Sequence, residues 1–176
     1  INNVNLGDGC SQIGNEAFFG CSNLYLTTIP ETVTSINDGA FRSCTSLNNI
    51  IYYATCKIPE SAFQGCSSLY NFNINSGTTI DVDSYAFQDT YLSTIAFNMI
   101  NPIGNSIFYN TQFTSVEIPN TWATIKDSLF ENSRITSLTF ESPSTLTSIE
   151  SSSFQGCPLS SMSTLTIPDS VQTIGS

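Results

Sequence analysis

Hydrophobic residues recur along this chain at a nearly constant interval, and phenylalanine marks the interval most clearly. The spacings between successive copies are 23, 22, 24, 21, 22 and 24 residues. A period of this length is typical of solenoids, in which each repeat forms one coil and packs only on its neighbours. The pattern therefore predicts a repeat array and not a conventional globular domain. The recurring residues are Phe18, Phe41, Phe63, Phe87, Phe108, Phe130 and Phe154.

Other positions keep a fixed distance from each phenylalanine. A looser apolar position lies eight residues before it and includes Cys10 and Trp122, for which core packing is the default expectation. A small residue and then an aliphatic or aromatic residue follow it. An aliphatic residue also stands five positions before the phenylalanine in every copy, and these residues are expected to face the core. They are Ile13, Ile36, Ile58, Val82, Ile103, Ile125 and Ile149, with Ile174 at the start of an eighth copy.

Each repeat then contains a short stretch of alternating polarity that is often closed by proline. Alternation with a period of two predicts a β-strand, and proline is suited to ending one. The phase of this alternation predicts that the side chains of Tyr52, Phe72, Phe97 and Phe140 face the core. The predicted strands are Thr27–Pro30, Ile50–Tyr52, Phe72–Ile74, Ile95–Phe97, Val116–Pro119, Leu138–Phe140 and Leu165–Pro168.

The repeat resembles that of the BspA-like leucine-rich-repeat family, which carries the same A-F-x-x-C and I-x-I-P words. The first, second and third copies match it in Ala17-Phe18, Ala40-Phe41 and Ala62-Phe63, each followed by a cysteine. The resemblance implies a mainly β repeat solenoid, a right-handed superhelix with one strand per coil of 21–24 residues forming a parallel sheet, and short strands or turns on the other side. It also implies a surface-exposed or secreted protein, because members are associated with adhesion to host matrix proteins or to other cells.

The repeats extend over the whole chain without an interior boundary. We therefore expect residues 1–176 to form a single array of about seven repeats. Both ends interrupt a repeat, so the chain is expected to be a fragment of a longer protein. A signal peptide or anchor would lie outside it, and the expected location is the cell surface or the extracellular space.

Composition narrows the possible partners. The chain has 14 acidic and 4 basic residues, no histidine and a net charge of −10. Nucleic acid and anionic membranes are disfavoured as partners, because lysine and arginine drive phosphate binding. No apolar run approaches the roughly 18 residues that span a bilayer, so direct membrane insertion is not expected.

The six cysteines are more typical of core packing than of disulfide bonds or a metal site. Cys21, Cys44 and Cys66 occupy one repeat position and should stack, but stacked parallel Cβ atoms lie farther apart than a disulfide prefers, which favours buried free thiols. Cys56 has no clear place in the repeat and is expected to be the most exposed. Without histidine or paired close spacings, neither a metal site nor a cofactor is predicted.

Enzymatic activity lacks support in the sequence. Nucleophilic catalysis by serine or cysteine usually requires a base, most often histidine. Two carboxylates could serve a polysaccharide-cleaving enzyme, and the best candidates are Asp81 with Asp83 or Glu141 with Glu150. Solvated turn residues explain these carboxylates better. We predict no catalytic residues.

The side of the strands that faces away from the core is the candidate ligand-binding surface. Residues alternate between the two faces of a strand, so two outward columns follow from the phase. They are rich in amides and hydroxyls, with an apolar group among them. Tyr25, Tyr70 and Tyr109 are further candidates for surface contact. The predicted ligand-binding residues are Leu26, Thr28, Asn49, Ile51, Tyr53, Asn71, Asn73, Thr94, Ala96, Ser115, Glu117, Ser137 and Thr139.

Three functions remain open at this point. The favoured one is a non-enzymatic recognition or adhesion module that binds a protein or glycan ligand, such as extracellular matrix or a host or other cell surface. The second is a passive spacer, because an exposed sheet can carry Asn, Ser and Thr only for solubility. The third is a polysaccharide-acting solenoid enzyme.

Overall fold

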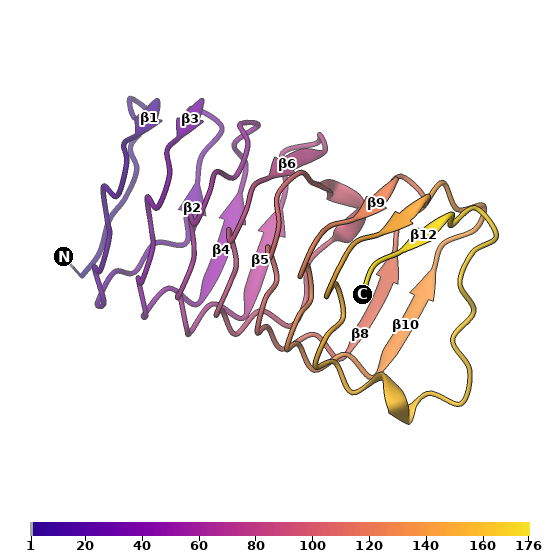
Figure 1. Ribbon diagram of the computed structural model, residues 1–176. Helices are drawn as coiled ribbons and strands as arrows, with labels where there is room; N and C mark the ends of the chain where they lie inside the picture. Colours follow the sequence, from indigo (N-terminus) through magenta and orange to yellow (C-terminus); the bar gives the residue numbers. More distant parts are fainter. Residues whose placement is uncertain (1) are drawn as a thin grey trace.

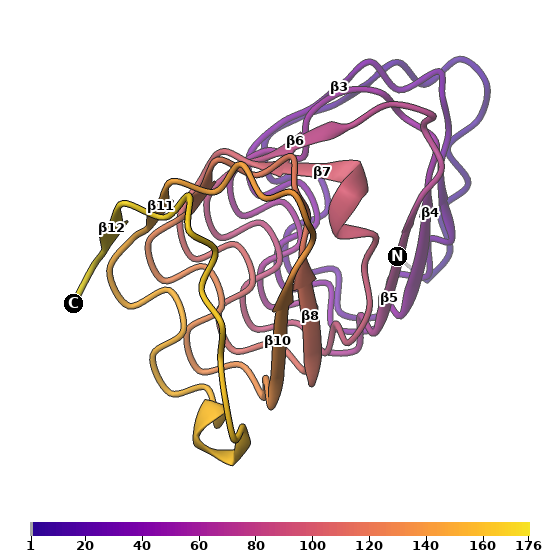
Figure 2. The ribbon, with the colours of Figure 1, turned by 90° about the vertical axis from the view of Figure 1, so that its right-hand side faces the viewer.

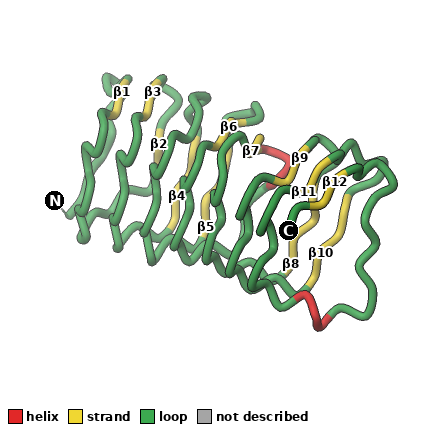
Figure 3. The backbone as a smooth tube through the Cα atoms, in the orientation of Figure 1, coloured by secondary structure: helices red, strands yellow, loops and turns green. Residues whose placement is uncertain are grey.

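The computed structural model describes residues 2–176 as a stack of about seven coils (Figure 1). The coils lie side by side in chain order, with the amino terminus at one end of the stack and the last strand near the other. Figure 2 looks along the stack from the carboxyl-terminal end and shows each coil as an open ring. Strands occupy two sides of the ring, and turns occupy the remainder (Figure 3).

The first row of strands contains the longer ones. Thr28 pairs with Ile51, and Ile51 in turn pairs with Asn73, all in parallel. Farther along, Glu117 pairs with Thr139. The exposed side of this row is called the strand face below. Its strands are β2 (Thr28–Ile29), β4 (Asn49–Tyr52), β5 (Asn71–Ile74), β8 (Ser115–Ile118) and β10 (Ser137–Phe140).

The second row consists of shorter parallel strands that follow the position five residues before each phenylalanine. Its register joins Ile13 to Ile36 and Ile149 to both Ile125 and Ile174, and Ile58 bridges to Val82. The aliphatic column predicted from the sequence therefore builds this row. Its strands are β1 (Gln12–Ile13), β3 (Ser35–Ile36), β6 (Ile80–Val82), β7 (Ile100–Pro102), β9 (Thr124–Ile125), β11 (Ser148–Ile149) and β12 (Thr173–Ile174).

A tight turn surrounds each phenylalanine on the third side of the coil. The backbone has positive φ two residues before and two residues after the ring, as at Ser61 (55°) and Gly65 (71°) around Phe63. Glycine, asparagine and aspartate tolerate this conformation best, and most of these positions hold Gly, Ser, Asn or Asp. Glu16 and Tyr85 adopt it as well. The two reversals direct every ring toward the axis of the stack.

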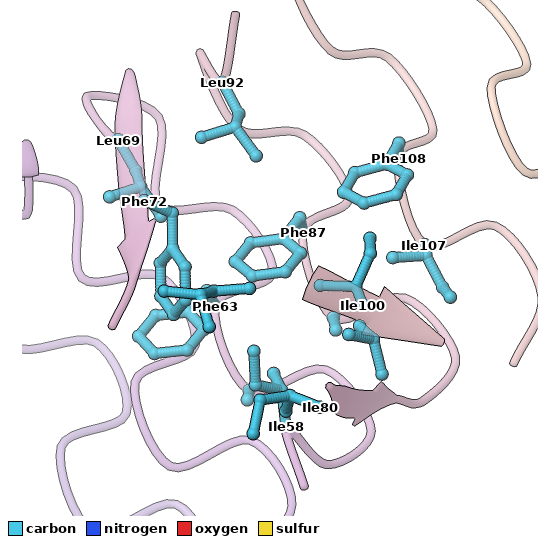
Figure 4. Packing of buried hydrophobic residues seen from close by; sticks show 14 of the residues in the cluster. Ile58, Phe63, Leu69, Phe72, Ile80, Phe87, Leu92, Ile100, Ile107 and Phe108 are labelled. Atoms are coloured by element: carbon cyan, nitrogen blue, oxygen red, sulfur yellow. The ribbon is translucent and has the colours of Figure 1, made fainter. Parts of the chain in front are cut away.

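Backbone hydrogen bonds join these turns from coil to coil. The Phe63 N–H donates to the Ala86 carbonyl at 2.9 Å, and the Ser61 and Gly65 N–H groups donate to the same neighbouring coil. The rings stack as a result, with centroids 5.2–5.8 Å apart and planes within 13° of parallel. Figure 4 shows Phe63, Phe87 and Phe108 in this column, beside Ile58, Ile80 and Ile100. Together they form one continuous core.

From Cys44 onward, the small residue after each phenylalanine donates a side-chain hydrogen bond to a phenylalanine carbonyl. The Cys66 thiol donates to the Phe41 carbonyl at 3.1 Å, and the Thr111 hydroxyl donates to the Phe108 carbonyl at 2.8 Å. Ser133 also bonds the Phe108 carbonyl, at 2.9 Å. Cysteine, threonine and serine exchange at this position because each is small and can satisfy a buried carbonyl.

Two residues of the aliphatic column are exposed. Ile174, in β12, is 64% exposed. Ile103 is 43% exposed, and Pro102 takes its place in the row by pairing with Val82. The N–H groups of Ile103 and Gly104 both donate to the Val82 carbonyl, so the strand gains one residue here. A Cβ on Gly104 would lie 2.0 Å from the Ser84 nitrogen, which explains the glycine.

Two predicted strands of the first row are absent from the described structure. The Ile95–Phe97 segment leads into a short 3₁₀ helix, η1 (Phe97–Met99), and the Leu165–Pro168 segment pairs with no described strand. The second 3₁₀ helix, η2 (Leu159–Ser161), precedes that segment, which swings away from β10 in Figure 1. The first row is therefore interrupted twice.

Truncation of a stacked ring should destabilise the array strongly. Phe87→Ala removes a side chain that is 0% exposed and stacked on both sides, so we expect a loss of about 3–5 kcal/mol in urea unfolding. Phe19→Ala is the matched control. Phe19 is 50% exposed, and its ring makes a cation–π contact with the Arg42 guanidinium. This substitution should cost less than about 1 kcal/mol. Equal losses for the two variants would contradict the stacked core.

Candidate functional site on the strand face

The two outward columns face solvent over most of the array. Asn73, Thr94 and Ala96 are exposed, as are Ser115, Glu117, Ser137 and Thr139 at later coils, and Tyr53 is 38% exposed. Thr28, Asn49, Ile51 and Asn71 are half-buried between neighbouring strands. With one exception, the residues that the sequence pattern predicts to point away from the core do so in the structure.

Leu26 is the exception, because it is only 4% exposed and belongs to the core. Asn3 bridges to Tyr25, whereas Thr28 pairs with Ile51, so the offset between the first two coils is one residue shorter than the next offset. The extra residue is taken up at Thr27, which is exposed, just before β2. Leu26 therefore points inward beside Leu24, and the predicted apolar island on the strand face loses it.

The amino-terminal half of the strand face is a paired sheet. The Asn71 side-chain amide donates to the Asn49 side-chain oxygen at 2.7 Å, which fixes both amides across β4 and β5. Ile51 and Tyr53 lie beyond them on β4 and at its end. Tyr25 and Tyr70, at 55% and 50% exposed, stand just before the strands. Aromatic and apolar side chains here lie beside amides that already have partners.

The carboxyl-terminal half is hollowed where η1 replaces a strand. A hollow of about 410 Å³ lies between the segment before η1 and β8. Four residues of the predicted columns line it, namely Thr94, Ala96, Ser115 and Glu117. The structure thus brings together side chains that the sequence placed in separate coils. This is called the first hollow.

Phe97 forms part of the wall of the first hollow and was not among the predicted ligand-binding residues. Its ring packs edge-on against Phe108, Trp122 and Phe130 at 5.7–5.8 Å, yet it remains half-buried because η1 leaves its outer side uncovered. The closing I-P of the repeat gave no signal for this interruption, since β4, β5 and β10 lack it as well.

A second, larger hollow of about 550 Å³ opens beside β10. One wall contains Thr139, Phe140 and Glu141, and the other contains Met162, Thr164 and Thr166. Glu141 also borders the first hollow, so the two hollows meet there. Phe140, predicted to be core, is half-buried because no strand covers its far side. This is called the second hollow.

The carboxylates considered for catalysis are engaged separately. Asp83 forms an ion pair with Lys57 at 3.1 Å, whereas Asp81 accepts a hydrogen bond from the Asn101 amide at 2.8 Å. Glu141 accepts from the Asn120 N–H at 3.0 Å. Glu150 accepts from the Asp127 N–H at 3.0 Å and follows β11, in the other row of strands. The arrangement suits caps and turns that join neighbouring coils.

The six cysteines, all within the described residues, are free thiols. Cys44 and Cys66 are buried, whereas Cys10, Cys21, Cys56 and Cys157 are half-buried. Cys56 is therefore half-buried like three other cysteines, and the prediction that it is the most exposed of the six gains no support. Its thiol lies 3.3 Å from the Tyr52 hydroxyl, which donates to the Cys56 carbonyl at 2.8 Å.

Burial changes the acidity of the inner thiols and of this tyrosine. Desolvation raises the pKa of Cys44 to about 11, with a smaller contribution from neighbouring Cys21. It also raises the pKa values of Cys66, Cys157 and Tyr52. These groups therefore stay neutral near pH 7.

Within residues 2–176 there is neither a metal-binding cluster nor a membrane-spanning helix. No group of three or more Cys, Asp or Glu side chains in that range is placed to hold a metal ion. The helical segments in that range are too short and too polar to span a bilayer.

Comparison with known proteins agrees with the geometry of the coils. The model of the BspA-type leucine-rich-repeat region matches residues 1–101 and 101–176, with six copies. The chain belongs to this family. A search of curated proteins gave no match. A crystal structure of a leucine-rich-repeat protein from Bacteroides ovatus is similar in fold, with a TM-score of 0.52 and 17% identity, over 99% of this chain and 75% of the other.

The buried thiols of this BspA-type array should react only after unfolding. In a variant that retains Cys44 and Cys66 and has serine at the other four positions, labelling by a soluble thiol reagent near pH 8 should be at least about a hundredfold slower than in urea. The reason is that the raised pKa suppresses the reactive thiolate and burial blocks access. Because the pKa of Cys44 is raised, labelling should accelerate only as the pH approaches 11. Fast labelling of the folded protein near pH 8 would contradict the assigned burial.

Proposed function

We propose that this chain is a non-enzymatic recognition module of a cell-surface or secreted protein, and that its strand face binds a protein or glycan ligand. The observation that carries the proposal is the first hollow, where Thr94, Ala96, Ser115 and Glu117 converge beside Phe97. Recognition sites are typically concave, with apolar walls and a few directed polar groups. The first hollow has both, on a face that repeats along the array.

The chemistry of the hollow indicates the class of ligand. Hydroxyl groups of Thr94 and Ser115 and the Glu117 carboxylate can bond to hydroxyls, amides or ammonium groups, and Phe97 offers part of an aromatic ring. Glycans and protein surfaces carry these groups. A phosphate-rich polymer would meet a carboxylate here and an overall charge of −10. Extracellular matrix and host or other cell surfaces are the sources that the family resemblance favours.

The amino-terminal half of the strand face can extend the contact for a large partner. Ile51, Tyr53 and Tyr70 supply apolar area next to the paired amides of Asn49 and Asn71. Exposed tyrosines contribute contact area at a small entropic cost, which suits them to recognition surfaces. A ligand that spans several coils would cover both halves.

The first test fills the first hollow without disturbing the core. Ala96 is exposed, so Ala96→Trp should fold normally and occupy the space beside Phe97. Binding to a panel of matrix proteins and glycans should fall at least about tenfold, a cost of about 1.4 kcal/mol, measured by surface plasmon resonance. Ser67→Trp is the matched control, because Ser67 is exposed and lies outside both hollows, and it should bind like the unmodified chain.

Other outcomes would favour the alternatives. No binding to any matrix, cell-surface or glycan ligand would indicate a spacer. Turnover of a polysaccharide that is lost in Asp81→Asn or Asp83→Asn would indicate an enzyme. Loss of binding in Ile51→Asp and Tyr53→Ala, but not in Ala96→Trp, would move the recognition surface to the amino-terminal half.

A further inference from the structure

The second hollow lies at an open edge of the first row of strands. β10 pairs only with β8 among the described strands, in a two-stranded sheet. An edge strand presents unpaired N–H and C=O groups to whatever lies beside it. The wall of the second hollow formed by Leu138, Thr139, Phe140 and Glu141 is this edge.

The register identifies the unpaired groups. The Glu141 N–H donates to the Ile118 carbonyl at 2.9 Å, so the amide of Glu141 faces β8. Amide groups of successive residues in a strand point to opposite edges, so Thr139, two residues before Glu141, faces β8 as well, and Leu138 and Phe140 face the second hollow. Two N–H donors and two C=O acceptors are therefore directed into it, at the spacing of a strand.

The second hollow exists because the chain does not form a strand at the position beside β10 where the repeat would place one. The residues around η2 lengthen this coil, and the Leu165–Pro168 segment stands off from β10 (Figure 1). Leu165 is 36% exposed, whereas its counterparts Ile50, Phe72, Val116 and Leu138 are buried. The space left is about 550 Å³, which falls within the roughly 300–1,000 Å³ typical of ligand sites.

The negative charges at the second hollow favour a positively charged partner. Glu141 and Asp169 line one end, and no lysine or arginine is among the lining residues. A second copy of this chain would bring another −10 charge to the same edge. Thr139, Thr164 and Thr166 supply hydroxyls along the walls, and Met162 supplies an apolar surface.

We propose that the second hollow binds an extended peptide segment by strand addition. The segment bonds to the N–H and C=O groups of Leu138 and Phe140 and places a lysine or arginine beside Glu141 and Asp169. Main-chain bonds supply most of the affinity in this mode, and the flanking charge supplies selectivity. The inference stands apart from the first hollow, since Ala96→Trp should leave peptide binding unchanged.

The experiment uses the full chain and a short probe peptide of alternating threonine and valine with lysine at both ends. Amide hydrogen exchange by NMR should show slower exchange at Leu138 and Phe140 when the probe binds. Thr139 is the internal control, because its amide already faces β8 and should not change. Two further probes carry N-methyl groups at alternate sets of residues. One of them should bind at least about tenfold more weakly and the other like the parent, because only one set of probe amides faces β10.

Charge variants complete the test. Glu141→Gln and Asp169→Asn should each weaken the lysine-flanked probe by up to about fivefold at low salt, and a glutamate-flanked probe should bind more weakly than the lysine-flanked one. Equal binding by both N-methylated probes would overturn strand addition. Protection of Leu138 and Phe140 without any probe would also overturn it, since the Leu165–Pro168 segment or a second copy would then fill the hollow. Protection that rises with protein concentration would identify the second copy.

Discussion

The structure depends on one constraint, the burial of a phenylalanine inside a turn of every coil. A turn normally lies on the surface and directs its side chains outward. Here the backbone reverses twice, two residues before and two residues after the ring, and the N–H groups at those positions bond to the next coil. Each turn therefore combines a core side chain with a ladder of inter-coil hydrogen bonds.

The turn geometry is the same in every coil, whereas the strands on the far side of the coil vary in length and pairing. Coil length varies between 21 and 24 residues from one phenylalanine to the next, and the turns stay in register throughout. The variation must therefore be absorbed elsewhere. It appears as the extra residue before Thr28, as the bulge at Ile103 and Gly104, and as the two interruptions of the first row. The hollows of the strand face are the consequence of a rigid turn column and a variable remainder.

The sequence predicted what is local and missed what depends on neighbours. Inward and outward positions within one coil follow from period and phase, so Phe63, Trp122 and Thr139 were placed correctly. Leu26, Ile103 and the Leu165–Pro168 segment were not, because their orientation is set by pairing with another coil. Since a slip of one residue turns a side chain to the other face, a small change of offset is enough to invert the prediction.

Regular coils and irregular coils consequently differ in the polar groups that they leave unpaired. Where pairing is complete, as at Asn49 and Asn71, the outward groups already bond to one another and have little left to offer a ligand. Where pairing fails, at η1 and beside β10, hydroxyls, a carboxylate, an aromatic ring and strand-edge amides all remain available. Affinity arises from groups that are fixed in position but not yet satisfied. The interruptions meet that condition because intact turns hold them on both sides, and this supports the proposal that the recognition surface lies where the strand pairing breaks.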